Sequence, residues 1–358
     1  MRLGIFGLPQ SGKTTLFNAL TRGTQPTGTV TGKIEIHDAV VDVPDARVDV
    51  LSSMFNPKKT IYAKVNYADI AGLDGSAGKS GISGELLNKL AQMDGFIHVV
   101  RCFQNDQVIH PNGSINPERD IETMDSEFII NDLIAVEKRL ERLTEEKKKG
   151  GGRDKALIDR DIDLFNRMHE CLVEEKPLRD IELNPEEEKT ISGFGLLSRK
   201  PILILLNLDE TQNPPSIAYS HQRSKIDSIR GKIEMELAQL PAEDVSMFME
   251  EYNITELGLN RVIRLSYDLL GLESFFTAGA DECRAWTLQK NSTAPEAAGV
   301  IHTDLQKGFI RAEVIAYQDL IELGGMVEAK AKGKLRLEGK EYIVKDGDIL
   351  NIRFNVSK

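Results

Sequence analysis

The first fifteen residues constrain the fold more than any other stretch of the chain. Met1–Phe6 is a short apolar segment typical of a strand, Gly7–Thr15 reads GLPQSGKTT, and Leu16–Thr21 has the character of a helix. The middle segment matches the spacing GxxxxGK[ST], the phosphate-binding loop, or P-loop, that joins a strand to a helix. Backbone amides at such a helix start form a positive concave site for phosphate oxygens. The N-terminus therefore predicts a nucleotide-binding domain.

The polar side chains of this loop have expected roles. Lys13 would reach the β- and γ-phosphates, and the Thr14 hydroxyl would be a ligand of Mg²⁺. We expect the phosphate cradle to consist of Pro9, Gln10, Ser11, Gly12, Lys13, Thr14 and Thr15. An ordinary glycine-rich turn is the alternative, which the flanking strand and helix disfavour.

Length and composition set the broad class. At 358 residues the chain is too long for one typical core, which predicts two or three domains. The net charge of -11 argues against nonspecific coating of nucleic acid. No basic leader precedes the first strand and no run of about 18 apolar residues occurs, so we expect a cytoplasmic protein without a membrane span. Three scattered cysteines, Cys102, Cys171 and Cys283, predict reduced thiols and no zinc site.

A second motif completes a candidate NTPase site. The β-like segment Thr60–Ala68 runs into Asp69–Gly72 (DIAG), a DxxG pattern downstream of the P-loop. In such a site the aspartate holds a Mg²⁺-bound water and the glycine amide senses the γ-phosphate. The next residue is Leu73, where Ras-type enzymes have the glutamine that orients the attacking water. Because leucine cannot orient water, we predict slow hydrolysis or a catalytic group from elsewhere. The glycine-rich stretch 74–84 is either a switch loop ordered by the γ-phosphate or a plain surface loop.

Further apolar segments predict a mostly parallel sheet and a base-reading loop. Gly95–Phe103 continues the alternation of strands and helices, and Pro201–Leu206 is apolar throughout, as expected of a central strand. The latter runs into NLDE (207–210), where a GTPase would have NKxD. The lysine is replaced by Leu208 and the aspartate by Glu210, whose side chain is one methylene longer. A misplaced base-reading pair leaves buried polar groups unpaired, at about 1–3 kcal/mol, so we expect adenine in preference to guanine.

Together these motifs are similar to those of the YchF-type, or Obg-like, ATPase family of TRAFAC-class P-loop NTPases. The resemblance runs over nearly the whole chain, and its further motifs are VPDARVD (43–49), HVVRCF (98–103) and NPERDIET (116–123). The family has a hydrophobic residue in place of the catalytic glutamine, which Leu73 matches, and NxxE in place of NKxD. The resemblance implies binding and slow hydrolysis of ATP, with Mg²⁺ as cofactor.

The resemblance also implies roles for individual residues. A histidine after HVVRCF substitutes for the glutamine in the family, and His110 matches it. The residue after the asparagine helps to read adenine, which gives Leu208 a role through its backbone. Catalysis would then involve Lys13 and His110, and metal binding Thr14 and Asp69. The nucleotide would also contact Gly72, Asn207, Leu208 and Glu210. Judged from the residues alone, an ordinary loop histidine remains the alternative for His110.

The chain departs from the family pattern at the P-loop and in both switches. The P-loop reads QSGKT where the family has NVGKS, although Thr14 can still bind Mg²⁺. In the first switch, aligned to 29–37, Lys33 stands where a threonine is typical, and glycine-rich substitutions follow Leu73. Hydrolysis rate and switch mechanism are therefore the properties that transfer least from the family.

Two further regions complete the expected domain organisation. Apolar residues recur at three- and four-residue steps in 129–143 and again in 158–172, on either side of KKKGGG, which predicts an antiparallel helical hairpin. From Ser274 onward, short alternating segments with glycine turns predict hairpins, as in 334–344. The resemblance identifies this region as a TGS domain, a small β-grasp module. The expected fold is α/β, with a P-loop NTPase (G) domain over 1–126 and 199–273, an inserted helical hairpin over 127–198, and a C-terminal TGS domain over 274–358.

The sequence leaves partners and rival functions open. Lys147, Lys148, Lys149, Arg153 and Lys155 lie at the tip of the expected hairpin, where RNA contact and a plain solvated helix end are both consistent with them. TGS modules occur in proteins that meet tRNA or ribosomes, so the resemblance implies a ribosome or ribosomal subunit as partner, beside ATP or GTP. We expect a monomer. The rival classes are an Obg-type GTPase and a non-catalytic, nucleotide-gated binding protein.

Overall fold

The structure is a computed structural model that describes residues 1–23, 36–70, 83–150, 152–251 and 256–355. The chain divides into two compact units. The first consists of Met1–Ala39 and Asn66–Val262, and the second of Val40–Val65 and Ile263–Lys358. Residues 40–65 therefore group with the C-terminal part of the chain, whereas the sequence alone places them in the nucleotide-binding domain.

The first unit is built on a six-stranded sheet with the strand order β2-β4-β1-β5-β6-β7. Strand β1 pairs in parallel with β4 and β5, and β5, β6 and β7 continue the parallel arrangement. Strands β5 and β6 are buried along their whole length, as expected of central strands. The bounds are β1 (Arg2–Phe6), β2 (Ile36–Asp42), β4 (Lys64–Ile70), β5 (Gly95–Arg101), β6 (Ile202–Asn207) and β7 (Ser224–Ile229).

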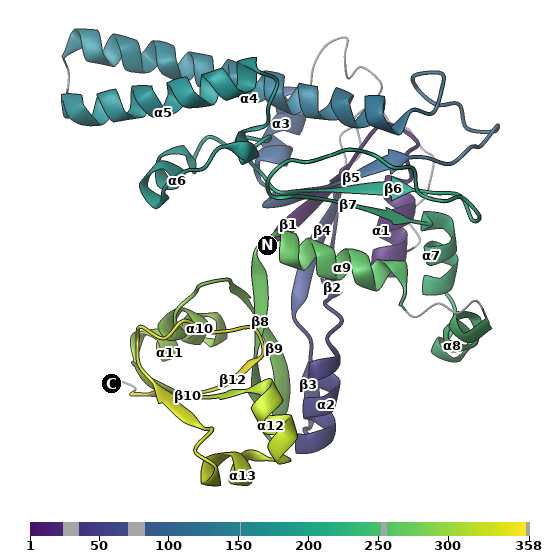
Figure 1. The fold of residues 1–358 in the computed structure, drawn as a ribbon, viewed down its shortest axis with the longest axis vertical. Coiled ribbons are helices and arrows are strands. Elements are labelled where there is room, and N and C mark those ends of the chain that lie inside the picture. The colour runs from purple at the N-terminus through teal and green to yellow at the C-terminus, as the bar shows by residue number, and fades with distance from the viewer. Residues whose placement is uncertain (24–35, 71–82, 151, 252–255, 356–358) are drawn as a thin grey trace. The chain divides into compact units, whose positions relative to one another are not determined.

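Helices cover both faces of this sheet (Figure 1). Helix α3 (Gly84–Ala91) and the start of α4 pack on one face through a buried cluster that includes Leu90, Phe96 and Phe128. On the other face, α1 (Lys13–Thr21) contacts α7 (Gly231–Ala238). Helices α8 (Ala242–Glu251) and α9 (Gly258–Leu269) follow α7 along the chain. This alternation of parallel strands and covering helices confirms the expected α/β class.

An inserted pair of helices forms the antiparallel hairpin that the sequence predicts (Figure 1). Helices α4 (Pro117–Lys149) and α5 (Lys155–Val173) pack along each other, and the recurring apolar positions, including Val136, Leu143 and Phe165, form their shared core. Helix α4 begins before residue 127, so one continuous helix runs from the sheet into the hairpin. The short elements η1 (Leu178–Asp180) and α6 (Pro185–Ile191) precede β6. Neither α4 nor any other helix in the described ranges is long and apolar enough to cross a membrane.

The second unit contains another six-stranded sheet, with the order β11-β10-β12-β8-β9-β3. Strands β8 and β9 form an antiparallel hairpin, β12 pairs in parallel with β8, and α10 contacts both β9 and β10. This is the β-grasp arrangement. Its strands are β3 (Lys59–Ile61), β8 (Leu272–Ala278), β9 (Glu282–Gln289), β10 (Phe309–Ala316), β11 (Arg336–Glu338) and β12 (Asp348–Phe354). Its helices are α2 (Ala46–Phe55), α10 (Ala294–Ile301), α11 (Thr303–Lys307), α12 (Tyr317–Leu323) and α13 (Met326–Ala331).

The prediction of one strand over the segment 60–68 is wrong. The segment is interrupted after β3 and resumes as β4, and the two strands belong to different sheets. Strand β3 pairs in parallel with β9, and the preceding Lys58 forms an ion pair with Asp281. Arg47 of α2 adds an ion pair to Asp346. These contacts explain why residues 40–65 belong to the second unit.

The predicted hairpin within 334–344 is also wrong. Strand β11 pairs antiparallel with β10, in the register Ala312↔Glu338 to Val314↔Arg336. Ile343 forms only an isolated bridge, to Thr293. Alternating polar and apolar residues indicate a strand but do not identify its partner, which the tertiary fold selects.

Candidate functional site

The P-loop joins β1 to α1 at the carboxyl edge of the parallel strands. Gly7 and Gly12 have φ angles of 148° and 99°, which residues with side chains rarely adopt. The space for a side chain at these two positions is restricted as well. A Cβ on Gly7 would lie 2.3 Å from the Val99 carbonyl oxygen, and one on Gly12 would lie 2.1 Å from Asn207 Nδ2. Both glycines are thus required by conformation and by packing.

Lys13 begins α1 and reaches back to the loop before it. Its Nζ donates hydrogen bonds to the carbonyl oxygens of Gly7 (3.0 Å) and Leu8 (2.9 Å). The ammonium is therefore held beside the loop amides that would cradle a phosphate. Of the other cradle residues, Ser11 is buried, Gln10 is exposed, and Pro9, Gly12, Thr14 and Thr15 are intermediate.

Asp69 comes to the P-loop from the end of β4. Its Oδ2 accepts a hydrogen bond from Thr14 Oγ1 at 2.9 Å. Burial raises the pKa of Asp69, while the Thr14 hydroxyl and the Lys13 ammonium act in the opposite direction. Its other oxygen, Oδ1, is buried without a hydrogen-bond partner among the described residues.

The Thr14 and Asp69 pair fits a magnesium ion. Mg²⁺ prefers oxygen ligands and usually takes one or two carboxylates, with the rest of its coordination from substrate phosphates and water. A hydroxyl beside an unpartnered carboxylate oxygen supplies the protein's share of such a site. In the part of the chain that the structure describes, no group of three or more His, Cys, Asp or Glu side chains could hold a metal.

Asn207 connects the P-loop to the start of α7, which follows β7 at the same edge of the sheet. It ends β6, its Nδ2 donates to the Ser11 carbonyl oxygen at 3.0 Å, and its Oδ1 accepts from the Gly231 amide at 3.1 Å. A Cβ on Gly231 would lie 2.9 Å from Asn207 Oδ1. Gly231 could not be identified from the sequence, because its partner is 24 residues away and no motif marks it.

The other residues of the NxxE motif have different environments. Leu208 is 4% exposed, its side chain packs in the core, and its amide donates to the Ile229 carbonyl oxygen at 2.8 Å. The side chain and N–H of Leu208 are therefore committed to the fold, and its carbonyl oxygen is the group that it can offer to a base. Glu210 is exposed and forms an ion pair with Lys232 across 3.0 Å.

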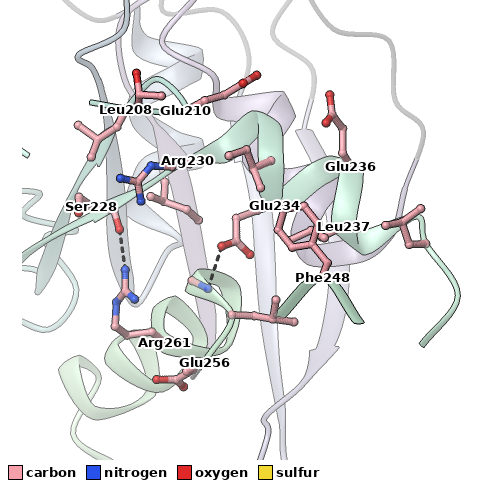
Figure 2. A pocket seen from close by; sticks show the side chains of 16 residues that line it. Leu208, Glu210, Ser228, Arg230, Glu234, Glu236, Leu237, Phe248, Glu256 and Arg261 are labelled. Atoms are coloured by element: carbon pink, nitrogen blue, oxygen red, sulfur yellow. Dashed lines mark hydrogen bonds between the residues drawn. The ribbon is translucent and has the colours of Figure 1, made fainter. Parts of the chain in front are cut away.

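Leu208 and Glu210 also line a cleft of about 860 Å³ beside α7 and α9 (Figure 2). Glu234 projects into it from α7, and its carboxylate accepts hydrogen bonds from the amides of Gly258 (2.8 Å) and Leu259 (3.2 Å) at the start of α9. None of the described P-loop residues lines this cleft. We therefore do not assign the phosphates of a nucleotide to it.

His110 lies in the loop between β5 and α4. Its side chain is buried, Nδ1 accepts a hydrogen bond from the Asn112 amide at 3.1 Å, and Nε2 lies 3.0 Å from Asp120 Oδ2. Because Nδ1 is an acceptor, the ring proton is on Nε2, facing the carboxylate. Burial lowers the pKa of His110 below its ordinary value, although Asp120 opposes this effect, and the neutral ring is therefore favoured at pH 7.

Among the described residues, no hydrogen bond or ion pair joins His110 to the P-loop. Its contacts are with its own loop and with the first turn of α4. Its pairing with Asp120 was not predicted from the sequence, although Asp120 lies in the NPERDIET motif. Gly72, Leu73, residues 29–35 of the first switch and residues 74–82 of the second lie outside the described residues.

A second histidine lies close to the phosphate site. His98 of β5 is fully buried and stacks on Phe6, with ring centroids 4.7 Å apart. Burial, together with the charge of Lys13, lowers the pKa of His98 to about 3. The imidazole is therefore an uncharged side chain on the strand next to β1, which leads into the P-loop.

The sheet, the loop and the side chains around it are characteristic of one kind of enzyme. A parallel sheet carries a glycine loop with Lys13 and Thr14, an aspartate at the end of the neighbouring strand, and an asparagine that braces the loop. These are the parts of a P-loop NTPase with a G-type domain, here joined to a helical insertion and a β-grasp module.

Comparisons with known proteins identify the family. The sequence profile of 50S ribosome-binding GTPases matches residues 2–139, and that of the YchF GTPase C-terminal region, described as a protein of unknown function, matches residues 272–355. The chain is 41% identical over 365 residues to the ribosome-binding ATPase YchF of Bacillus subtilis, and 39% identical over 364 residues to that of Escherichia coli O157:H7, with 99% of both chains covered each time. The solved structure of the Schizosaccharomyces pombe YchF GTPase has a TM-score of 0.81 at 28% identity, covering 99% of this chain and 97% of that one. The chain belongs to the YchF family.

Proposed function

We propose that this protein is a nucleotide switch that binds ATP with Mg²⁺ and hydrolyses it slowly. The observation that carries the proposal is the Asn207 bridge. Its hydrogen bonds to Ser11 and Gly231 hold the loop that bears Leu208 and Glu210 beside the P-loop. The relatives whose alignment with this chain covers 99% of both chains are named ATPases, which supports the same activity here.

The phosphate end of the site would work by positioning and charge. The loop amides and Lys13 would stabilise negative charge on the β- and γ-phosphates, and Thr14 and Asp69 would hold the metal. Mg²⁺, when bound, neutralises charge that develops on the transferred phosphoryl group. The close contact between Thr14 and Asp69 supports this assignment, because the two ligands are already adjacent.

The base end of the site favours adenine. The Leu208 amide and side chain are used by the fold, so a base would meet its carbonyl oxygen, an acceptor. Adenine presents an amino donor at its position 6, whereas guanine presents an acceptor oxygen there. Glu210 carries its carboxylate one methylene further out than the aspartate of NKxD and pairs with Lys232, which weakens the reading of guanine.

Competition between ATP and GTP tests the base assignment. The affinity of each nucleotide for the full chain is measured with Mg²⁺ present. We expect ATP to bind more tightly. GTP binding more than about tenfold tighter, near 1.4 kcal/mol, would replace this proposal by an Obg-type GTPase.

His110 is proposed to orient the attacking water in place of the missing glutamine. One observation favours the rival function, a non-catalytic nucleotide-gated binder: Nδ1 and Nε2 of His110 are both engaged, with Asn112 and Asp120. Single-turnover hydrolysis decides between them. Measurable turnover that is lost in H110A supports catalysis, and no turnover in the wild-type protein supports the binder.

Association with ribosomes is proposed from the names of relatives, which are called ribosome-binding, and from the C-terminal β-grasp module. We also propose that the protein is a cytoplasmic monomer. We propose that it has three parts: a nucleotide-binding domain over 1–126 and 199–273, an inserted helical domain over 127–198, and a C-terminal domain over 274–358. RNA contact at the hairpin tip is part of this proposal, since the ion pairs that Lys147, Lys149 and Arg153 form there with carboxylates are accessible to solvent and therefore weak. Nucleotide-dependent co-sedimentation with purified ribosomal subunits tests the association, and equal sedimentation with and without ATP would contradict a switch.

A further inference from the structure

Arg101, the last residue of β5, is a buried cation that the proposed function does not use. It is 3% exposed, and burial lowers the pKa of its guanidinium. Its hydrogen-bond partners among the described residues are carbonyl oxygens and not carboxylates. Burial of a charge without a carboxylate partner costs free energy, so a gain in stability does not account for an arginine at this position. The presence of arginine here therefore requires another explanation.

The guanidinium is the centre of the loop that follows it. Nε donates to the Phe103 carbonyl oxygen at 3.2 Å, and Nη2 donates to those of Asn105 (3.4 Å) and Val108 (2.9 Å). Its Cζ also lies 4.7 Å from the centroid of the Phe103 ring. Three carbonyls from one short segment can converge on a single group only if the segment folds around it. The planar guanidinium of arginine donates from several nitrogens and suits this arrangement. Lysine has a single side-chain nitrogen and cannot reproduce it.

This loop begins beside Asn207, which is hydrogen-bonded to the P-loop, and ends at His110. Arg101 is paired with Asn207 in the register of β5 and β6, and the Cys102 amide donates to the Asn207 carbonyl oxygen at 2.9 Å. The last carbonyl held by Arg101, that of Val108, is two residues before His110. The loop is thus fixed at one end to the residue that supports Ser11 and at the other to Asp120.

We propose that Arg101 is a positioning residue, which folds the loop 103–110 so that His110 has a defined place relative to the nucleotide. The inference rests on the proposed role of His110 in hydrolysis. Arg101 itself contacts no substrate in this assignment. It acts through the backbone of the loop, and both its charge and its fork shape are needed.

Single-turnover ATP hydrolysis and ATP affinity are measured for R101M, R101K, H110A and the double variant R101M/H110A. R284M is the matched control, since Arg284 also stacks on an aromatic ring, that of Trp286, but lies in the other unit. Thermal unfolding verifies that each variant is folded. R101K keeps a cation in the buried site and replaces R101M in the comparison if R101M does not fold.

We expect R101M and R101K to lose about 100-fold in turnover rate, as a misplaced catalytic group does. Their affinity for ATP should change by less than about threefold, because the P-loop contacts are kept. R101M/H110A should be no slower than H110A, since both changes remove the same contribution, and R284M should match the wild-type protein. Wild-type rates in both Arg101 variants, or a multiplicative loss in the double variant, would overturn the proposal. A wild-type rate in H110A would overturn it at its premise, the role of His110.

A pH profile separates positioning from a structural role. The charged groups that face His110 are Asp120 and Arg119 of α4 and Arg101 of β5, and the two arginines lower its pKa. R101M removes one of these positive charges, so the pKa of His110 should rise and the acid limb of the rate profile should move to higher pH. R101K should leave that limb in place. Identical limbs in R101M and the wild-type protein would contradict the inferred proximity of the two groups.

Discussion

Thr14 Oγ1 donates a hydrogen bond of 2.9 Å to Asp69 Oδ2, although 55 residues separate the two along the chain. The contact joins the start of α1 to the end of β4, two elements that flank the same strand, β1. It places a hydroxyl and a carboxylate where a nucleotide's metal ion would need both.

Removing the Asp69 charge should weaken the effect of magnesium on nucleotide binding. D69N preserves the shape of the side chain and can still contact Thr14, but its amide is a poor partner for the metal or its water. Loss of such a partner typically lowers metal affinity by about 10- to 100-fold. ATP affinity is measured by titration with and without Mg²⁺, and T14S, which keeps the hydroxyl, is the control. An equal benefit from Mg²⁺ in D69N and the wild-type protein would remove Asp69 from the metal site.

Adding a single methyl group at Gly12 should displace the side chain of Asn207 and break its hydrogen bond to Ser11. In G12A the new Cβ would lie 2.1 Å from Asn207 Nδ2, on a backbone with φ of 99°. The control is G150A, where φ is 65° and no atom lies within 4 Å. The conformational strain alone costs about 1–2 kcal/mol in a residue with a side chain, and we expect G150A to lose only that. Chemical denaturation and ATP binding should show a larger loss of stability in G12A and a loss of affinity that G150A does not share.

Shortening Glu210 should change the choice of base. E210D restores the carboxylate length of NKxD and lengthens the distance to Lys232, now 3.0 Å. We expect the ratio of GTP to ATP affinity to rise by about tenfold, which corresponds to 1.4 kcal/mol. E236D, on the same cleft, serves as the control. If competition binding gives the same ratio in E210D and E236D, Glu210 does not read the base.

Asp132 should make stability depend on pH. It is buried in α4 and accepts hydrogen bonds from the Leu197 amide (2.9 Å), the Ser198 amide (2.7 Å) and Ser198 Oγ (2.6 Å), which fasten the end of the insertion to α4. Burial raises its pKa from 3.8 to about 6. The folded state thus binds a proton more tightly than the unfolded state, and this contribution to stability is complete below pH 3.8 and is lost as the pH rises through about 6.

The variant D132N lacks this titration. The free energy of unfolding of the wild-type protein, relative to D132N, should therefore increase as the pH falls from 7 to 4. D163N, a change on the exposed surface of α5, should show no such trend. Urea denaturation at several pH values measures the difference, and a constant difference across the range would contradict the assignment.

Several features could be predicted from local sequence because their physical cause is local. The P-loop is specified by neighbours along the chain, with Gly7 and Gly12 in conformations that favour glycine and Lys13 at the start of the helix. The hairpin is specified by periodicity, since Val136 and Leu143 recur on one side of α4. Sequence could not predict that β3 leaves the segment 60–68 for another sheet, because strand pairing is a long-range choice.

Residue types and short motifs are enough to identify the chemistry of this protein: a phosphate loop, an aspartate and an asparagine with the side chains that such a site needs. The residues that those groups contact depend on the fold. It placed Asn207 between Ser11 and Gly231, committed the Leu208 amide to β7, and gave His110 the carboxylate of Asp120 as a neighbour. A residue's type and its close neighbours fix its conformation and functional groups, whereas its partners depend on which distant segments the packed sheet brings to the same edge.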